Sequence, residues 1–302
     1  MSIYVEQFQT PSYFKNSDSW TILSKIEACI KSKIEAIGKP LKEWDININR
    51  GILTGLNEAF IISTETRNSL IAADPKSAEI IRPILRGRDI KRYTYTFAEL
   101  WLIATFPSRH YDIDDYPAIK EHLLSYGIER LEQTGLKHIV NGLEIKARKK
   151  TSNKWFETQD SINYWNDFSK RKIMYNDICQ KLSFALVPEN IFCVNTVYFI
   201  KDTPDLTYLL ACLNSKVTDW YYRTLSVQLG AKAVRMFSIY VEQLPIPKLE
   251  GESYTLLSQL ADSLVSDGEP NSSDINNQID QILYDAYGFS EEEIKLIEES
   301  YN

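Results

Sequence analysis

The amino-acid sequence predicts an α+β fold. Segments in which apolar residues recur every three or four positions, typical of amphipathic helices, occur among short runs rich in β-branched and aromatic residues, typical of strands. The two kinds of segment follow one another without regular β-α-β alternation. The composition, with 44% hydrophobic and 25% charged residues, excludes a disordered or low-complexity chain. We therefore expect a mixed-sheet domain with peripheral helices.

The N-terminal part predicts one helix and then two strands. A helix is expected over residues 20–38, because Gly38 followed by Pro40 provides a stop signal after a series of apolar residues at helical spacing. Residues 43–63 then alternate between apolar and polar and are interrupted by glycines, which predicts two strands around a tight turn. The apolar residues of the helix are Ile22, Leu23, Ile26, Ile30, Ile34 and Ile37.

The middle of the chain predicts further strands and helices. Clusters of β-branched and aromatic residues predict strands over residues 100–104, 172–176 and 196–200. Apolar residues at helical spacing predict helices over residues 76–85, 117–133 and 206–225.

The C-terminal part predicts an extended connection followed by three helices. The segment Leu-Pro-Ile-Pro at residues 244–247 is expected to be extended, because proline is excluded from helix interiors and central strands. Helices are expected over residues 253–266 and 274–287. Ser290 and Glu293 then form a capping-box pattern for a last helix that ends at residue 299.

Charge is distributed unevenly between these parts. The whole chain carries a net charge of -7, but residues 249–302 contain 13 acidic residues and one basic residue, a net charge of -12. The other 248 residues contain 33 basic and 28 acidic residues, a net charge of +5. The acidic total therefore conceals a basic body that suits a polyanionic partner. We expect residues 1–248 to form the main domain and residues 249–302 an acidic helical segment.

Several enzyme motifs are absent from the sequence. There is no G-x-x-x-x-G-K-[ST], G-x-G-x-x-G, G-x-S-x-G or H-E-x-x-H, and no Pro-Pro pair of the kind that adenine methyltransferases use to hold their target base. The four cysteines form no C-x-x-C pair and the three histidines lack the spacing of zinc motifs. We therefore expect reduced cysteines in the core, no metal and no cofactor in this chain.

The sequence shows no membrane or export signal. Its N-terminal segment is polar and aromatic, and no apolar run approaches the ~20 residues of a membrane helix. We expect a cytoplasmic protein without a membrane partner.

The basic residues of the main domain gather in four clusters. They lie within residues 82–92, 146–150, 170–172 and 216–235. Lysine and arginine gain affinity for DNA because they release the counterions condensed on its phosphates. One such cluster is commonly a solvated surface, but four clusters upstream of an acidic segment favour a partner such as DNA.

Six sequence blocks resemble the TaqI-like C-terminal specificity domain, the target-recognition part of type IIG and related restriction-modification enzymes. The blocks occur in the family's order between about residues 20 and 250. They are RGILTGLNEAFII at 50–62, IIRPILRGRDIKRY at 80–93, KRKIMYNDI at 170–178, NTVYFI at 195–200, YLLACLNSKV at 208–217 and LPIP at 244–247.

The resemblance implies that the chain recognises a defined sequence in double-stranded DNA. In the family, this domain follows a methyltransferase domain that binds S-adenosylmethionine and methylates adenine, and a magnesium-dependent nuclease domain often precedes both. The chain itself has no catalytic motif, so the resemblance implies a non-catalytic recognition domain whose partner is a methyltransferase domain or subunit.

The resemblance and the basic clusters together indicate candidate DNA-binding residues. The arginines of the R-G-R-D sequence are expected to contact phosphates while Asp89 holds the loop. Base-reading residues are expected within residues 109–116 and 135–164, which lack the family pattern. The candidates are Arg50, Thr54, Asn57, Arg86, Arg88, Lys91, Arg92, Lys137, Lys146, Arg148, Lys149, Lys150, Asn153, Lys154, Lys172 and Lys216.

Two alternative functions remain open from the sequence. Asp114, Glu144 and Lys146 imitate the D…E-x-K order of magnesium-dependent nucleases, in which carboxylates bind the metal and a lysine assists the attacking water. The acidic helical segment could instead make the chain a protein-interaction module.

Overall fold

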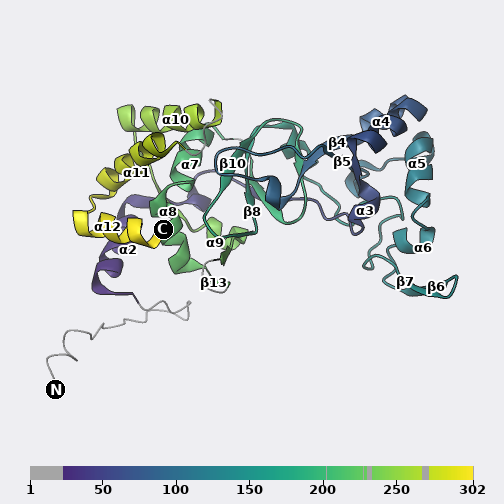
Figure 1. Cartoon of the computed structure of the whole chain (residues 1–302), viewed down its shortest axis with the longest axis horizontal. Coiled ribbons are helices and arrows are strands. Elements are labelled where there is room, and N and C mark those ends of the chain that lie inside the picture. The colour runs from purple at the N-terminus through teal and green to yellow at the C-terminus, as the bar shows by residue number, and fades with distance from the viewer. Residues whose placement is uncertain (1–22, 202, 227, 230–232, 267–271, 302) are drawn as a thin grey trace, which may run out of the picture.

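The structure, a computed structural model, describes residues 23–301 apart from residues 202, 227, 230–232 and 267–271. Figure 1 shows an elongated molecule with long helices at one end, strands in the middle, and short helices with a β-hairpin at the other end.

A central antiparallel sheet joins the two ends of the molecule. Its strand order is β10-β8-β12-β2, with bounds Phe184–Val187, Lys172–Asn176, Val197–Ile200 and Ile48–Arg50. The residues of β10, β8 and β12 are buried on both faces except at the end of β8. Successive side chains of a strand point to opposite faces, so Ile173 and Tyr175 enter one core while Met174 enters another.

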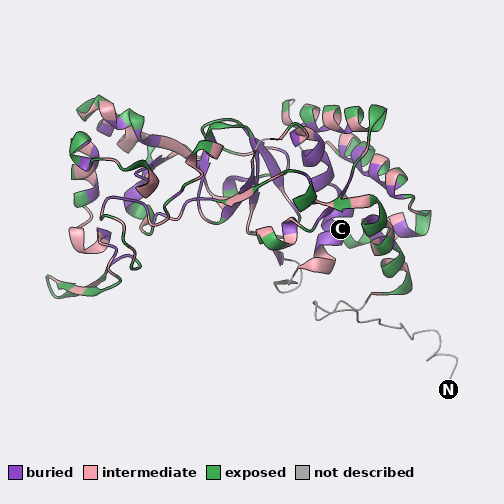
Figure 2. Ribbon diagram, turned by 180° about the vertical axis from the view of Figure 1, so that it is seen from behind, coloured by how far each residue is buried: buried purple, intermediate pink, exposed green. Residues whose placement is uncertain are grey.

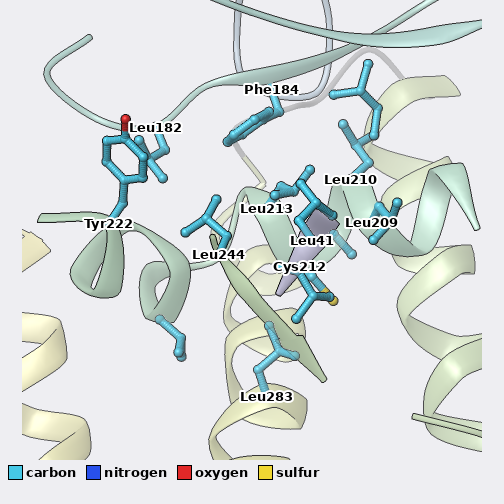
Figure 3. Close-up of a cluster of buried hydrophobic side chains, with 14 of the residues drawn as sticks. Leu41, Leu182, Phe184, Leu209, Leu210, Cys212, Leu213, Tyr222, Leu244 and Leu283 are labelled. Atoms are coloured by element: carbon cyan, nitrogen blue, oxygen red, sulfur yellow. The ribbon is translucent and has the colours of Figure 1, made fainter. Parts of the chain in front are cut away.

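The first core lies between this sheet and a group of helices. Figure 3 shows how leucines from distant segments, such as Leu41, Leu210 and Leu283, meet in it. Helices from both ends of the chain contribute, since Ile30 and Ile297 are both fully buried there. The helices are α2 Lys25–Ile37, α7 Leu206–Leu213, α8 Lys216–Leu225, α10 Gly251–Ser266, α11 Ser273–Tyr287 and α12 Glu291–Tyr301.

The second core lies between the other face of the central sheet and a mixed sheet. This mixed sheet has the order β11-β4-β5-β3, in which only the β11–β4 pair is parallel. Its strands are β11 Phe192–Cys193, β4 Ile81–Leu85, β5 Leu100–Ile103 and β3 Ile61–Ser63. Around it lie α3 Asn57–Phe60, α4 Thr64–Ala73, α5 Pro117–Leu124 and α6 Ile128–Leu131.

Three small β structures complete the described fold. β1 Gly38–Pro40 pairs with β15 Pro245–Pro247, the three strands β13 Gln228–Leu229, β14 Ala233–Arg235 and β9 Ile178–Cys179 form another sheet, and β6 Lys137–Val140 pairs with β7 Leu143–Lys146. The short helix α9 is Ser238–Val241. The 3-10 turns are η1 Leu41–Glu43, η2 Pro75–Glu79, η3 Gly87–Asp89, η4 Pro107–Arg109, η5 Ile113–Asp115 and η6 Trp165–Ser169.

The structure confirms the α+β class and most of the predicted elements. The strand over residues 172–176 is confirmed at its bounds, and those over residues 100–104 and 196–200 are each one residue shorter. The three C-terminal helices and the extended 244–247 segment are also present. Helix α2 begins at Lys25 after a capping box at Ser24, and the predicted start at Trp20 lies outside the described residues.

The predicted helix over residues 76–85 is wrong. This segment forms η2 and then strand β4, which pairs with β5 and β11. The spacing of Ile80, Ile84 and Leu85 suits a helix, but Pro83 clashes with a helix interior, and pairing with β5 stabilises the strand instead.

Two other predicted helices are each divided in two. Gly127, with φ of 87°, separates α5 from α6. Asn214 separates α7 from α8 because its side chain bonds the backbone of β10, accepting from the Phe184 N–H at 3.0 Å and donating to the Phe184 carbonyl at 2.9 Å. Ser215 then caps α8.

The predicted pair of strands within residues 43–63 does not form a hairpin. β2 and β3 belong to different sheets, with α3 between them. A side chain at Gly51 would overlap the Val194 carbonyl oxygen, so this glycine permits the close approach of two backbone segments rather than a tight turn.

The interpretation of all four cysteines as core residues is wrong for Cys29. Cys193 and Cys212 are buried and Cys179 is partly buried, but Cys29 is exposed on α2. All four are free thiols.

The division of the chain at residue 248 stays a prediction. The C-terminal helices share the first core with α2, α7 and α8. Lys33 on α2 also forms an ion pair of 2.7 Å with Glu293 on α12. The two termini of the described chain are therefore joined by apolar and ionic contacts.

We predict that Glu293→Gln lowers the free energy of unfolding by about 1–3 kcal/mol at pH 7, because charge-assisted hydrogen bonds are lost. Burial acts to raise the pKa of Glu293, but hydrogen bonds from Lys33 and from the Ser290 N–H outweigh burial and hold this pKa below its usual value. The ionised form therefore stabilises the fold above the unfolded-state pKa, and this stabilisation is lost as the pH falls through the lower folded-state pKa.

Urea denaturation at several pH values measures this effect. The difference from wild type should be constant from pH 7 to pH 5 and should narrow at lower pH. Glu292→Gln, at an exposed neighbouring position, is the control. A loss of unfolding free energy that does not depend on pH, or that equals the loss in Glu292→Gln, would contradict stabilisation by ionised Glu293.

Candidate nucleic-acid interface

A groove rich in cations lies beside the central sheet. It has a volume of about 870 Å³ and is lined by η3, β9 and the C-terminal end of α12. Its charged lining residues are Arg88, Lys91, Lys181, Arg223 and one acid, Glu299. We call this site the basic groove. Its excess of positive charge suits a phosphate backbone.

The R-G-R-D sequence builds one side of the basic groove. Asp89 accepts hydrogen bonds from the Arg86 backbone N–H at 2.8 Å and from the Arg86 guanidinium at 2.9 and 3.0 Å. Burial acts to raise the pKa of Asp89, but the bonds and charge of Arg86 outweigh burial and lower it. A side chain at Gly87 would overlap the amide of Asn176, so the loop packs closely on β8. Arg86 therefore fixes the loop, and Arg88 is left exposed at the groove.

A second charged region connects the central sheet to the far end of the molecule. Burial raises the pKa of Asp160, and the charges of Arg50 and Lys149 oppose this shift. Burial likewise raises the pKa of Asp177, opposed by Arg235 and Arg50. Hydrogen bonds agree with this placement. The Arg50 guanidinium donates to the Asn195 carbonyl at 2.7 Å, and the Asp177 N–H donates to the neighbouring Thr196 carbonyl at 2.9 Å. Arg50, Lys149 and Arg235 thus lie near the carboxylates of Asp160 and Asp177. We call these five residues the charged band.

Arg148 is predicted to contact DNA, but the structure places it inside the protein. Its side chain is 4% exposed and donates to the backbone carbonyls of Leu131, Thr54, Glu157 and Trp155 at 2.5 to 2.8 Å. Burial lowers the pKa of Arg148 to about 10, so the guanidinium remains charged at neutral pH. Arg148 thus ties together the segments from which the β6–β7 hairpin emerges.

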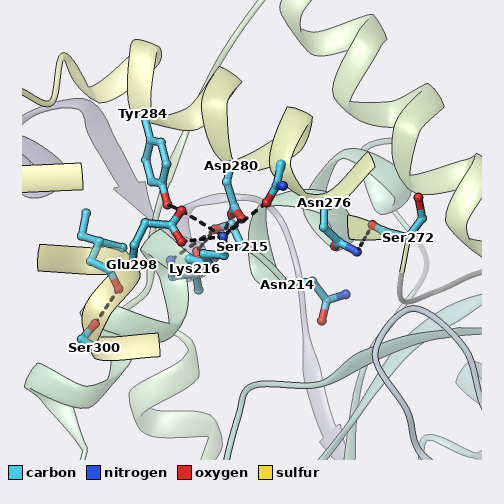
Figure 4. Close-up of polar contacts among 12 residues, drawn as sticks. Asn214, Ser215, Lys216, Ser272, Asn276, Asp280, Tyr284, Glu298 and Ser300 are labelled. Atoms are coloured by element: carbon cyan, nitrogen blue, oxygen red, sulfur yellow. Dashed lines mark hydrogen bonds and ion pairs between the residues drawn. The ribbon is translucent and has the colours of Figure 1, made fainter. Parts of the chain in front are cut away.

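Two predicted lysines also hold the fold. Lys172 is fully buried and donates to the carbonyls of Lys170 and Pro188 at 2.7 and 2.9 Å. Lys216 lies 2.8 Å from Glu298 and 3.5 Å from Asp280 (Figure 4). Burial acts to lower the pKa of Lys216, but these carboxylates outweigh burial and raise it.

The polar candidates near the second core have internal partners as well. Thr54 is fully buried and donates to the Asn57 side chain at 2.7 Å. Asn153 donates to the Gln159 carbonyl at 2.9 Å. The Arg92 guanidinium, farther away, donates to the Asn214 carbonyl at 2.6 Å. These contacts stabilise the fold.

The remaining candidates are exposed. Arg88 and Lys91 lie at the basic groove, Arg50 and Lys149 lie in the charged band, and the others lie on or after the β6–β7 hairpin. Lys181 was missed because it stands outside the basic clusters of the sequence, and only the turn between β9 and β10 brings it to the groove. The exposed candidates on or after the hairpin are Lys137, Lys146, Lys149, Lys150 and Lys154.

The geometry does not support the nuclease alternative. Asp114 forms an ion pair with Lys120, whereas Glu144 on the hairpin forms one with Lys137. Within the described ranges, no three His, Cys, Asp or Glu side chains are grouped so as to hold a metal ion. We do not propose this function.

Among the residues that the structure describes, no helix is both long enough and apolar enough to cross a bilayer.

Comparisons with known proteins identify a matching family and similar folds. The family model described as the TaqI-like C-terminal specificity domain matches residues 82–246. The fold is similar to that of MmeI, a type IIL restriction-modification enzyme solved in complex with DNA, with a TM-score of 0.58 and 15% sequence identity, over 84% of this chain and 35% of that chain. The type IIG restriction endonuclease BpuSI matches with a TM-score of 0.49 and 11% identity, over 87% of this chain and 33% of that chain. No curated protein matches in sequence.

The chain thus spans about a third of the length of each of these solved chains. At 15% identity, the likeness to MmeI shows a shared fold.

We predict that Arg148→Lys lowers the free energy of unfolding by about 2–4 kcal/mol, because a lysine keeps the charge but cannot reach four separate carbonyl groups. Chemical denaturation measures the effect. Lys149→Ala, at the exposed neighbouring position, is the control and should change stability by less than about 0.5 kcal/mol. Equal stability of Arg148→Lys and wild type would show that the buried guanidinium is not needed.

Proposed function

The chain belongs to the TaqI-like C-terminal specificity domain family, a DNA-recognition domain of restriction-modification enzymes, and from this premise we propose that it binds duplex DNA through the basic groove and the charged band. The match over residues 82–246, more than half of the chain, is the observation that carries this proposal. This match agrees with the family resemblance of the six sequence blocks.

The basic groove supplies the phosphate contacts in this proposal. Arg88 and Lys91 are both exposed, and the Lys91 ammonium donates to the Arg88 carbonyl at 2.9 Å. Their charges release counterions from the duplex without reading its sequence. Contacts of this kind set the register of the protein on the DNA.

The charged band supplies a more selective surface. The half-buried carboxylates of Asp160 and Asp177 lie among Arg50, Lys149 and Arg235. A carboxylate repels phosphate but accepts a hydrogen bond from the amino group of cytosine, while arginine favours guanine. The mixed charges in this band therefore favour contacts with base edges over contacts with the phosphates of the DNA backbone.

Catalysis is assigned to partner domains in this proposal. A methyltransferase domain or subunit would bind S-adenosylmethionine and modify the base, and a linked nuclease domain would use magnesium. The residues of this chain would bind and orient the duplex for them.

The protein-interaction alternative has less support. The apolar residues of α10, α11 and α12 are already buried in the first core, including Leu257, Leu283 and Ile297. The outer faces of these helices, which carry most of their acidic residues, remain for another protein.

We predict that Arg88→Ala combined with Lys91→Ala weakens binding of a random-sequence duplex. Each lost phosphate contact should reduce the slope of log affinity against log salt by about 0.9, so the slope should fall by about 2. Fluorescence anisotropy across a salt series measures this slope. Lys25→Ala combined with Lys295→Ala removes the same charge from exposed positions on α2 and α12 and should leave the slope unchanged.

Two results would count against the proposed function. Duplex binding that is absent, or insensitive to salt, would remove the role of phosphate contacts. Cleavage of the duplex by this chain when magnesium is added, lost in Glu144→Ala, would restore the nuclease alternative.

A further inference from the structure

The β6–β7 hairpin exposes large apolar side chains. Ile139 is 72% exposed and Leu143 is 70% exposed, the largest values among the exposed large apolar residues of the described chain. Leu136, just before the hairpin, is 59% exposed. Figures 1 and 2 show the hairpin extending from the end of the molecule, with most of its surface exposed. Cross-strand partners share a face, so Leu143 lies beside Val140 on one face and Ile139 lies beside Glu144 on the other. Exposed apolar side chains on both sides of a projecting tip indicate a binding partner.

The hairpin has a defined shape. Lys137 pairs with Lys146, Ile139 with Glu144, and Val140 with Leu143. Asn141 and Gly142 connect the strands with φ values of 51° and 79°, as a two-residue type I′ turn requires. Nothing lies within 4 Å of the position of a β-carbon at Gly142, so the tip is open to a partner.

The base of the hairpin is held firmly. The Ala147 N–H donates to the Leu136 carbonyl at 2.9 Å, and the Gly135 N–H donates to the Arg148 carbonyl at 2.8 Å. The buried guanidinium of Arg148 joins this base to carbonyls of three other segments. An isolated two-stranded hairpin is marginally stable, so this attachment is what keeps the arm in a fixed direction.

The charges around the hairpin suit a nucleic acid. Lys146 and Lys150 are exposed at and beyond the end of β7, and Lys137 faces Glu144 across the ladder at 2.8 Å. Lys149 connects the base of the arm to the charged band, because it acts on Asp160 together with Arg50. Phosphates on either side of a groove would meet these lysines while the apolar tip lies between them.

The dimensions of the hairpin also suit a groove. Four residues per strand extend it by about 14 Å. The major groove of B-DNA is about 12 Å wide and about 8.5 Å deep, and it admits a two-stranded β-ribbon. The arm is long enough to reach the floor of the groove.

We propose that the β6–β7 hairpin enters the major groove of the duplex and that Ile139 and Leu143 contact base edges there. This inference rests on the proposed function and adds to the charged band a second element that contacts base edges. Aliphatic side chains at this depth contact the methyl group of thymine, which distinguishes thymine from cytosine. The lysines at the base contact phosphates and contribute affinity that does not depend on sequence.

Selection from a pool of random-sequence 30-base-pair duplexes with the whole chain tests this inference. The double variant Ile139→Ser with Leu143→Ser should bind the enriched duplex about tenfold more weakly than wild type. Its affinity for the unselected pool should change by less than about twofold, because the lysines are retained. Both positions are exposed, so thermal unfolding should be unchanged.

A matched control removes apolar surface elsewhere. Ile37→Ser with Leu256→Ser changes side chains that are 44% and 38% exposed on α2 and α10. This control should bind both duplexes like wild type.

The outcomes separate this inference from the proposed function. Unchanged binding of the enriched duplex, or equal losses for the enriched duplex and the pool, would overturn base contact by the hairpin while duplex binding by the domain stands. Wild-type binding of the pool without enrichment of any sequence would also overturn it. If wild type binds no duplex at low salt, the proposed function itself fails.

Discussion

The burial of the central sheet on both faces is the constraint on which the rest of the structure depends. Within β8, Ile173 and Tyr175 pack among the helices, while Met174 between them packs against the mixed sheet. A shift of register by one residue would turn Ile173 and Tyr175 toward the mixed sheet and Met174 toward the helices, and it would disrupt the packing of both cores. The sheet therefore fixes the helical end relative to the end that carries the hairpin, and so fixes the basic groove relative to the charged band.

A second consequence follows from how the cations are used. Arg148 and Lys172 donate to backbone carbonyl groups of other segments, and Arg86 donates to Asp89 and holds its loop. A buried cation is tolerated only when such partners compensate for its lost hydration. The surface available to DNA is consequently smaller than the number of basic residues suggests, and it is set by Arg50, Arg88 and the lysines near the hairpin.

The acidic C-terminal helices take on a structural meaning as well. Their inner faces complete the first core, and their carboxylates neutralise cations of other segments, as Glu293 does for Lys33 and Glu298 for Lys216. Their remaining charge faces outward, away from the apolar contacts. Ion pairs within the protein therefore neutralise part of the opposite net charges of residues 1–248 and residues 249–302.

Local sequence patterns determined the α+β class, the strands at residues 172–176 and 197–200, the C-terminal helices and the family, because side-chain periodicity, proline and caps act over a few residues. Tertiary structure alone decided that residues 81–85 form a strand and that Asn214 interrupts a helix, because β5 and β10 offered hydrogen bonds from distant parts of the chain. It also decided which basic residues are exposed. Arg148 and Lys149 are neighbours with the same charge, and only the surrounding carbonyl groups bury one and leave the other at the surface.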